Sequence, residues 1–328
     1  MIIKDNAVIR KIFSFLMVKI IWYKFAKILF KPDMPVPPEK TRKIFIGNSS
    51  NKIKAGVPKI IWAYWDGPPS PSGEACQNSW RNYANGYEII LLNKKSLHEY
   101  IPYFPAIPSG TPVQLISDLI RLTLLEKYGG IWMDYSIILN KPIEEILIPL
   151  ENNHGDIFAF YNEHLGEYKK NHARPIVENG FIAARPGESF IKKWREYHQD
   201  CILSDNWKDY YKNFSNYRDL VSNFLTHDQD LIDYLACYVS AQRAMISLSD
   251  SRLVLVNAED DYYFCRYSIK SNLRSIRLAH LLLLAPVHSK KSIPGLVKLT
   301  RGNRLFIDEY IKYKCFVPGS MLGRYIEK

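Results

Sequence analysis

A helix, two glycines and a buried strand follow one another between residues 112 and 134, and this segment constrains the fold most. Residues 112–128 carry apolar side chains at helical spacing, and Thr111-Pro-Val-Gln114 has the pattern of a capping box with proline at the first helical position. Gly129-Gly130 ends this helix, and residues 131–134, three apolar residues followed by Asp134, are predicted to form a strand directly afterwards. A helix that leads straight into an apolar strand is typical of α/β folds.

Segments on both sides of this unit also alternate between strand and helix patterns. Strands are predicted at residues 59–65, 88–93, 137–140, 157–161, 181–185, 253–256 and 281–287. Helices are predicted at residues 74–83, 189–199 and 228–245. Because strands that alternate with helices usually form parallel sheets, the predicted fold class is α/β, with a mainly parallel central sheet in a Rossmann-like arrangement.

The composition excludes several classes of protein. With 47% hydrophobic and 23% charged residues, the 328-residue chain can form a full core and is unlike a disordered segment. Its five cysteines are scattered and include no CxxC pair, which predicts reduced thiols rather than a disulfide framework or a zinc site. The sequence contains neither a P-loop nor a GxGxxG fingerprint.

The net charge of +11 is concentrated at the two ends of the chain. Lysine and arginine outnumber the acidic residues in residues 1–31 and again in residues 286–328, whereas the residues between are close to neutral. Basic ends of this kind suit an anionic surface, either lipid headgroups or nucleic acid.

The pattern within residues 1–31 favours lipid. An apolar stripe at helical spacing lies opposite a row of lysines, as in a helix that lies in a membrane interface. The stripe consists of Phe15, Val18, Trp22, Phe25 and Leu29, and the lysines are Lys24, Lys27 and Lys31. The alternative is a helix that packs on the catalytic domain of its own chain. The longest uncharged apolar run, residues 12–18, is too short to span a bilayer.

Two ionisable residues are predicted to point inward from the helix at residues 112–128. Asp118 and Arg121 lie opposite the wet side that Glu126 and Lys127 define. Unpaired buried charge is expensive, so the pair needs partners. Either Asp118 and Arg121 pair with each other at i and i+3, or both contact a ligand, with sugar hydroxyls at Asp118 and a phosphate at Arg121.

The strand that follows carries a second polar cluster. Period-two alternation places Trp132, Asp134 and Ser136 on one face, and the carboxyl end of a strand is where open α/β sheets bind ligands. A carboxylate and a hydroxyl that point the same way suit a hard divalent ion. Such an ion would neutralise a departing diphosphate.

These residues together resemble a known family. Ser117-Asp-Leu-Ile-Arg121, followed by Lys127-Tyr-Gly-Gly-Ile-Trp-Met-Asp134-Tyr-Ser136, is similar to the glycosyltransferases with a DXD sugar-binding motif. The resemblance is to the bacterial capsular polysaccharide synthesis transferases, with kinship to yeast-type mannosyltransferases and clostridial glucosylating toxins. It is strong over about residues 57–140 and continues more weakly to about residue 290. It implies a GT-A fold, a nucleotide-sugar donor, a divalent cation (Mn²⁺ or Mg²⁺) and, in general, retention of configuration.

The resemblance also implies roles for individual residues. Asp118 and Arg121 match the pair that holds the donor sugar and its phosphate, and Asp134 matches the carboxylate associated with metal and ribose. Trp62, Ala63 and Trp65 match the strand whose aromatic residue stacks on the nucleotide base. The sequence departs from the family at Ser136, where the fuller motif has a second aspartate. One negative charge fewer is expected to weaken metal binding there.

Four later residues are implied by the same resemblance. Asn179 begins a glycine-containing segment near the donor sugar, although the simple start of a strand would explain it equally well. Asp228 follows His227 at a helix start, where it either belongs to the acceptor site or serves as a favourable N-terminal charge. His288 matches a histidine that ligates the metal or diphosphate, and Lys290 beside it would neutralise the diphosphate.

The sequence therefore predicts an enzyme, a hexosyltransferase that transfers sugar from a nucleoside diphosphate sugar, expected to be UDP-linked, to a lipid-linked or growing surface polysaccharide such as capsule or O-antigen. The expected partners are the donor, a lipid-linked glycan acceptor and an anionic membrane surface, without nucleic acid. The expected location is the cytoplasmic face of the bacterial inner membrane. The alternatives are a toxin-like protein glycosyltransferase and a non-enzymatic basic membrane-binding protein. The predicted domains are an amphipathic helix at 1–31, a linker at 32–54, a GT-A domain at 55–290 and a basic segment at 291–328.

Overall fold

The structure is a computed structural model, and it describes residues 11–12, 34–47, 56–166, 174–225, 228–248, 250–270, 273–287 and 293–326. Its strands are β1 (Lys43–Ile46), β2 (Ile60–Tyr64), β3 (Glu88–Leu92), β4 (Gly130–Met133), β5 (Ile137–Leu139), β6 (Ile157–Tyr161), β7 (Val177–Ala184), β8 (Leu253–Asn257) and β9 (Leu296–Lys298). Its longer helices are α3 (Pro71–Tyr83), α5 (Val113–Tyr128), α6 (Ile143–Asn152), α7 (Ser189–Leu203), α10 (Ala236–Ile246), α12 (Arg274–Leu284) and α13 (Arg301–Lys312). Shorter ones are α4 (Leu97–Tyr100), α8 (Tyr217–Val221), α9 (Gln229–Tyr234) and α11 (Phe264–Tyr267).

The central sheet has the strand order β1-β8-β6-β7-β4-β2-β3. β2 pairs in parallel with both β3 and β4, and β6 pairs in parallel with β8. β7 runs antiparallel between β4 and β6, and β1 runs antiparallel to β8 at one edge. Five strands therefore point the same way, and the expected α/β class with a mainly parallel central sheet is confirmed. A small second sheet pairs β5 with β9.

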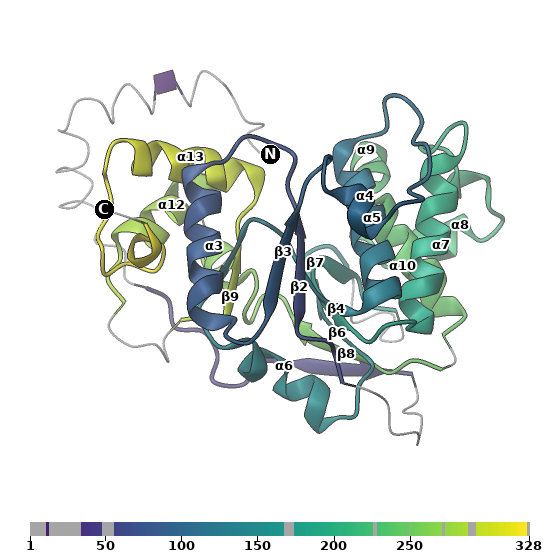
Figure 1. Cartoon of the computed structure of the whole chain (residues 1–328), viewed down its shortest axis with the longest axis horizontal. Helices are drawn as coiled ribbons and strands as arrows, with labels where there is room; N and C mark the ends of the chain where they lie inside the picture. Colours follow the sequence, from purple (N-terminus) through teal and green to yellow (C-terminus); the bar gives the residue numbers. More distant parts are fainter. Residues whose placement is uncertain are drawn as a thin grey trace.

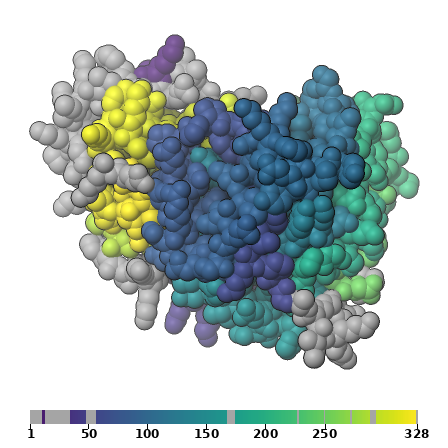
Figure 2. Space-filling model, in the orientation of Figure 1, coloured from purple at the N-terminus to yellow at the C-terminus, as the bar shows by residue number. Residues whose placement is uncertain are grey.

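Helices cover both faces of the central sheet (Figure 1). α5, α7 and α10 pack on one another on one side, and α3 packs against α13 on the other side, with α12 behind α13. In the face shown in Figure 2, the blue segment around residues 70–100 covers the centre, between the yellow C-terminal segment and the green helices of residues 190–245. Within the described residues, none of the helices combines the length and the apolar run that a membrane crossing requires.

The strands alternate between two apolar cores, as period-two geometry requires. Trp62 and Trp132 pack into the core beneath α5 and α7, together with Trp194. Their neighbours Ile61 and Ile131 face the opposite core, beneath α6. Because both faces of β2 and β4 are buried, the ends of these strands are the places where polar side chains can reach a ligand.

The expected strands at 59–65, 88–93, 131–134, 137–140, 157–161, 181–185 and 253–256 are confirmed as β2, β3, β4, β5, β6, β7 and β8, within a few residues at their ends. The strand expected at 281–287 is wrong, because residues 281–284 form the end of helix α12 and Pro286 makes only an isolated bridge with Ser320. Every residue from Leu278 to Leu284 is buried, so the apolar run there has no period that separates a strand from a buried helix. The helix expected at 228–245 is divided at Leu235 into α9 and α10.

The capping box expected at Thr111 is also wrong. The Thr111 hydroxyl donates to the carbonyl of Pro108, 2.9 Å away, so it does not cap α5. Pro112, with φ −58° and ψ 136°, precedes the first turn without a side-chain cap. The glycine stop is confirmed, since Gly129 ends α5 at a φ of 64° that favours glycine.

Parts of the segments outside the expected catalytic domain pack against that domain. β1 lies inside the stretch expected to be a linker and extends the central sheet. β9 and α13 lie inside the expected basic segment and pack against β5 and α3. The amphipathic helix expected at 1–31 lies outside the described residues, apart from 11–12.

Candidate active site

Asp118 and Arg121 project from one turn of α5 into the interior. An Nη2 atom of Arg121 lies 2.9 Å from Oδ1 of Asp118, and both side chains are buried. The ion pair expected at i and i+3 is therefore present. Arg121 also contacts Oδ1 of Asp134 at 3.4 Å, so the same guanidinium links the helix to the end of β4. Asp118 and Arg121 are therefore not an isolated ion pair but part of a larger charged cluster.

Asp134 is the first residue after β4, at the carboxyl end of the strand. Its backbone N–H donates to the carbonyl of Gly180 at 2.9 Å, which fixes the residue against β7. Oδ1 accepts from the indole N–H of Trp132 at 2.8 Å. Oδ2 accepts from the ammonium of Lys298 in a close ion pair. The carboxylate therefore has a donor or a cation at each oxygen.

Lys298 reaches this carboxylate through the small sheet. β9 runs antiparallel to β5 with Lys298 opposite Ile137, so its side chain emerges beside Ser136. Its Nζ donates to the Ser136 hydroxyl at 3.0 Å as well as to Asp134. Residues more than 160 positions apart in the chain are thus joined by one ammonium group.

Asn179 connects the two halves of the cluster. Its side-chain amide donates to Asp118 at 3.1 Å, and its backbone carbonyl accepts from Arg121. Tyr238 of α10 donates to the Asn179 side chain at 3.3 Å and to Glu178 at 3.0 Å. Asn179 thus lies beside the Asp118 and Arg121 pair, and its role near a donor sugar stays a prediction.

Gly180 lets β7 approach the cluster. A Cβ at this position would lie 2.0 Å from the Tyr262 hydroxyl and 3.0 Å from Oδ2 of Asp134. No side chain fits there without moving the carboxylate or the tyrosine. The glycine in the expected Asn179-Gly segment is therefore required by close packing.

The two carboxylates differ in electrostatic state. Burial raises the pKa of Asp118 to about 6, against the opposing effect of Arg121. Burial also acts to raise the pKa of Asp134, but Lys298 and Arg121 together outweigh it and hold the pKa of Asp134 below its usual value. Asp134 is therefore ionised near neutral pH, whereas Asp118 titrates close to neutral pH.

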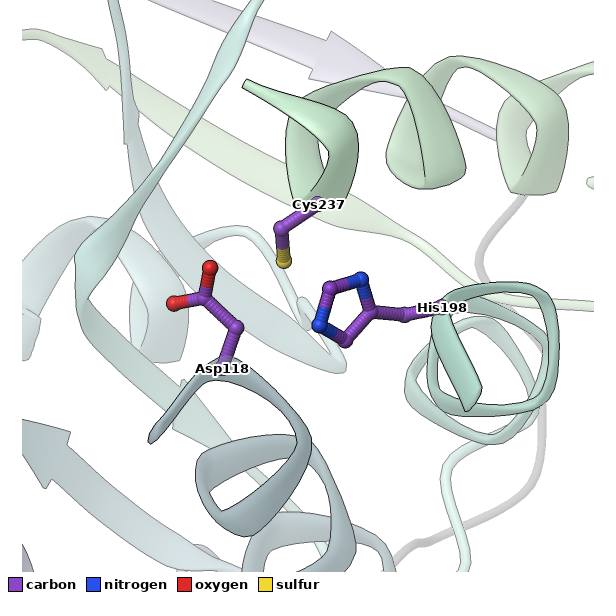
Figure 3. A group of neighbouring side chains, drawn as sticks. All are labelled: Asp118, His198 and Cys237. Carbon is purple, nitrogen blue, oxygen red and sulfur yellow. The ribbon is translucent and has the colours of Figure 1, made fainter. Parts of the chain in front are cut away.

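Asp118 has a second set of neighbours, His198 of α7 and Cys237 of α10 (Figure 3). One ligand atom from each of these buried side chains lies within 4.8 Å of the other two, so the group could in principle hold a metal ion. Burial lowers the pKa of His198 to about 4 and raises the pKa of the Cys237 thiol well above its usual value. A neutral imidazole, a protonated thiol and a carboxylate paired with Arg121 suit hydrogen bonding around Asp118 better than an ion.

An open cleft of about 830 Å³ lies along α3, and its link to the charged cluster is Tyr135, the chain neighbour of Asp134. Trp65, at the end of β2, and Tyr135, the neighbour of Asp134, both line it. Their rings stack with centroids 4.7 Å apart, and the guanidinium of Arg304 lies 4.7 Å from the Trp65 ring centroid. Polar side chains of α3, among them Gln77 and Asn78, form the opposite wall.

Several residues expected at the site lie elsewhere. Trp62 is 1% exposed, and its indole N–H donates to the Gly129 carbonyl, so the ring forms part of the core and does not face a nucleotide base. Ala63 is fully buried in the opposite core. Of the two tryptophans expected at the nucleotide base, Trp65 is the one that lines the cleft. Asp228 caps α9 by accepting from two backbone N–H groups, and its catalytic role stays a prediction. His288 and Lys290 lie outside the described residues.

Three residues of the cluster were not predicted to act there. Lys298 is one lysine among many in a basic segment, and only the β5–β9 pairing brings it to Asp134. Tyr238 and Trp132 fix Asn179 and Asp134 respectively. The alternation that placed Trp132 on the face of Asp134 was a usable signal, whereas nothing in the local sequence distinguishes Lys298.

Comparison with known proteins assigns the chain to a family. The family model described as "Capsular polysaccharide synthesis protein" matches residues 39–251, well over half of the chain. The chain belongs to this family. The matched residues include the whole cluster on α5, β4 and β7, and exclude Lys298, so the lysine contact is contributed by a part of the chain beyond the family match. The mainly parallel sheet with helices on both faces agrees with the GT-A fold that the resemblance implied.

Named relatives of this chain are glycosyltransferases. An O-glycosyltransferase of Annulohypoxylon truncatum (braB) is 40% identical over 161 residues, covering 42% of this chain and 36% of the relative. A glycosyltransferase of Aspergillus fumigatus (afumC) is 29% identical over 153 residues, covering 42% of this chain and 38% of the relative. The chain thus spans little more than a third of the length of these two relatives. Both are fungal.

Solved structures add a coarse likeness. A galactosyltransferase in complex with donor and acceptor sugar analogues superposes with a TM-score of 0.37 and 11% identity, over 82% of this chain and 96% of that chain. A glycosyltransferase named PaToxG superposes with a TM-score of 0.32 and 12% identity, over 73% of this chain and 89% of that chain. Because both TM-scores are low, the fold assignment rests on the sheet itself and on the family match.

The divalent ion expected at Asp134, Ser136 and His288 does not fit the described residues as they stand. The ammonium of Lys298 bridges Asp134 and Ser136, which are the two oxygen ligands that an ion would need. At an effective dielectric constant of 20, two unit charges 4 Å apart repel by about 4 kcal/mol, so a divalent ion would meet roughly 8 kcal/mol from the lysine alone. The ion could bind there only after Lys298 had moved away.

Proposed function

We propose that this chain is a glycosyltransferase that takes sugar from a nucleoside diphosphate sugar and transfers it to a hydroxyl of a lipid-linked or growing surface polysaccharide. The observation that carries the proposal is the buried cluster of Asp118, Arg121 and Asp134, which lies at the carboxyl end of β4. The family match and the named relatives support the reaction class.

In this proposal the nucleoside lies in the cleft beside Trp65, because an aromatic side chain at the cleft offers an apolar surface for a base. UDP is the nucleotide that we propose. The diphosphate then extends past Tyr135 toward the neighbouring Asp134. Arg121 is the fork that orients the phosphate and sugar, because its guanidinium already contacts both carboxylates.

Asp118 holds the sugar in place by accepting a hydrogen bond from a sugar hydroxyl. During transfer, the bond between the anomeric carbon and the diphosphate oxygen breaks, and its electron pair stays on the phosphate. The acceptor oxygen bonds to the same carbon and gives its proton to a departing phosphate oxygen. We propose that this exchange occurs on one face of the sugar and retains configuration. The expected manganese or magnesium ion is not part of this proposal, because Lys298 engages both Asp134 and Ser136.

The acceptor and the location rest on the N-terminal sequence. The apolar stripe and lysines of residues 1–31 would hold the enzyme on an anionic membrane surface, where a lipid-linked acceptor is concentrated. We propose the cytoplasmic face of a bacterial inner membrane. The matched relatives are fungal, and they support the reaction class rather than this location.

A toxin-like transferase that acts on protein is the alternative acceptor class for the same donor chemistry. The donor cluster of Asp118, Arg121 and Asp134 would serve either acceptor, so the acceptor has to be distinguished by experiment. The basic, amphipathic pattern of residues 1–31 favours the lipid-linked glycan.

A donor and acceptor screen tests the proposal. The full chain is incubated with radiolabelled nucleoside diphosphate sugars and either a bacterial lipid extract or soluble protein. We expect one donor to label the lipid-linked glycan fraction and not the protein. Label in protein alone would favour the toxin-like alternative. Absence of both transfer and donor hydrolysis, across all donors, would contradict the proposed function.

A further inference from the structure

Lys298 occupies the position that a divalent ion would take in this site. Its Nζ contacts a carboxylate oxygen of Asp134 and, at 3.0 Å, the hydroxyl of Ser136. These are the two side chains of the Asp134-Tyr135-Ser136 motif that offer oxygen ligands. An ammonium group has three N–H donors, so one remains for a ligand after both contacts are made.

The backbone on both sides of Lys298 is fixed. Its own N–H donates to the carbonyl of Tyr262 at 3.0 Å, and the N–H of Leu299 donates to the carbonyl of Ser136 at 2.9 Å. The lysine side chain is 15% exposed, which leaves one side open to the site. A lysine anchored in this way keeps its ammonium group beside Asp134 and Ser136 whether or not a ligand is bound.

The ion pairs of the cluster match its charges without a metal ion. Asp118 and Asp134 contribute two carboxylates and Arg121 and Lys298 two cations, joined by three ion pairs. Burial raises the pKa of the neighbouring Glu178, which favours its neutral form. An aspartate at position 136 would leave one carboxylate in excess and would favour a metal. The serine found there accepts a hydrogen bond from Lys298 without adding charge. The departure from the usual motif and the position of the lysine are therefore explained together.

A second cation lies on the same side of the site. Arg304 of α13 stands over Trp65, and its buried Nε has no hydrogen-bond partner in the described part of the chain. Trp65 stacks on Tyr135, which stands in the chain between Asp134 and Ser136, the two partners of Lys298. An anionic group beside Trp65 would therefore lie near Arg304.

We propose that Lys298 takes the place of the metal ion and that donor binding and transfer need no divalent cation. This inference rests on the proposed function. Lys298 donates its free N–H to a diphosphate oxygen of the donor and stabilises the charge that develops there as the bond to the sugar breaks. Arg304 contributes a second positive charge at the nucleoside end.

Binding of nucleoside diphosphates, measured by calorimetry, tests this inference without catalysis. UDP, GDP, CDP and ADP are titrated into the full chain, once with excess EDTA and once with manganese. We expect one of them to bind in EDTA, with a Kd that manganese changes less than about threefold. Lys298→Ala should weaken binding in EDTA by at least tenfold, and Lys298→Arg should keep most of it. Lys312→Ala, which removes an exposed lysine of α13, is the matched control and should bind as the wild type does.

A second variant tests the exchange of lysine for metal directly. Lys298→Ala combined with Ser136→Asp rebuilds a site with two carboxylates and no competing ammonium, so binding by this protein should require manganese. Thermal melting shows whether each variant is folded.

Two results would overturn the inference. One is a wild type that binds a nucleoside diphosphate with manganese and not in EDTA, which would leave the proposed function standing. The other is Lys298→Ala that binds in EDTA as tightly as the wild type. Binding of no nucleoside diphosphate under either condition would instead contradict the proposed function, and the inference with it.

Discussion

Arg121 lies 2.9 Å from Asp118 and 3.4 Å from Asp134, so one buried guanidinium links the two carboxylates of the site. The sequence left open whether Asp118 and Arg121 pair with each other or serve a ligand. The structure shows the ion pair and also shows that it borders the strand-end cluster. Structural and functional roles are therefore combined in one contact, and variants must separate them.

Arg121→Lys should separate these roles. Lysine keeps the positive charge but loses the planar fork, so it cannot contact Asp118, Asp134 and the Asn179 carbonyl together. We expect kcat/KM for donor hydrolysis to fall about a hundredfold, or roughly 3 kcal/mol of transition-state stabilisation. Melting temperature measured on the same protein should fall only modestly. Wild-type turnover in a protein that is merely less stable would show that the pair is structural.

The pH dependence should follow Asp118, whose pKa burial raises to about 6 from its usual 3.8. Because folding favours the protonated form, the contribution of Asp118 to stability is full below about pH 4 and is lost as the pH rises through 6. Activity should run the other way, since the carboxylate is the form that accepts a hydrogen bond from sugar. We expect kcat/KM to rise with pH with an apparent pKa near 6, and the residual activity of Asp118→Asn to lack this step. A step that persists in Asp118→Asn would assign it to another group.

Gly180→Ala should disturb the site from within β7. The added Cβ would meet the Tyr262 hydroxyl at 2.0 Å and Asp134 at 3.0 Å, so one of these side chains must move. We expect a loss of about 1–3 kcal/mol in the free energy of unfolding and at least tenfold weaker donor binding. Gly319→Ala, where a Cβ meets nothing within 4 Å, is the control and should leave both unchanged. A Gly180→Ala protein with wild-type donor binding would contradict the described packing.

Trp65 and Trp62 should behave differently although they lie three residues apart. Trp65→Ala removes a ring that lines the cleft, so nucleoside diphosphate binding should weaken about tenfold while the fold is retained. Trp62→Ala empties a buried position and should cost about 3–5 kcal/mol of stability. Chemical denaturation and calorimetry on both variants check the pair of expectations. Unchanged nucleotide binding by Trp65→Ala would move the base away from this cleft.

The sequence predicted the elements that have a clear periodic pattern of apolar residues. The helix that holds Asp118 and Arg121 and the strand before Asp134 have clear helical and strand patterns, and both are found at the expected places. Alternation also predicts that Trp62 and Ile61 face opposite sides of the sheet. It does not predict which core Trp62 enters, or that its ring is too buried to contact a ligand. The family resemblance placed an aromatic residue at the base, and burial decides that Trp65 is the one available.

Long-range pairing could not be predicted. Lys298 acts at Asp134 only because β9 pairs with β5, and no local pattern in residues 296–298 specifies that partner. The failure of the strand predicted at 281–287 has a related cause, since a leucine run buried on all sides has no period. Features set by the neighbours of a segment, such as the raised pKa of Asp118, likewise appear only in the folded chain.

The central claim is that Asp134 belongs to a donor site, and the release of nucleoside diphosphate from the preferred sugar donor tests it most directly. The rate is measured for the wild type, for Asp134→Asn and for Asp205→Asn, which changes an exposed aspartate away from the cluster. The account predicts that Asp134→Asn lowers the rate at least a hundredfold without unfolding the protein, and that Asp205→Asn matches the wild type. A folded Asp134→Asn protein that releases nucleoside diphosphate at the wild-type rate would contradict it.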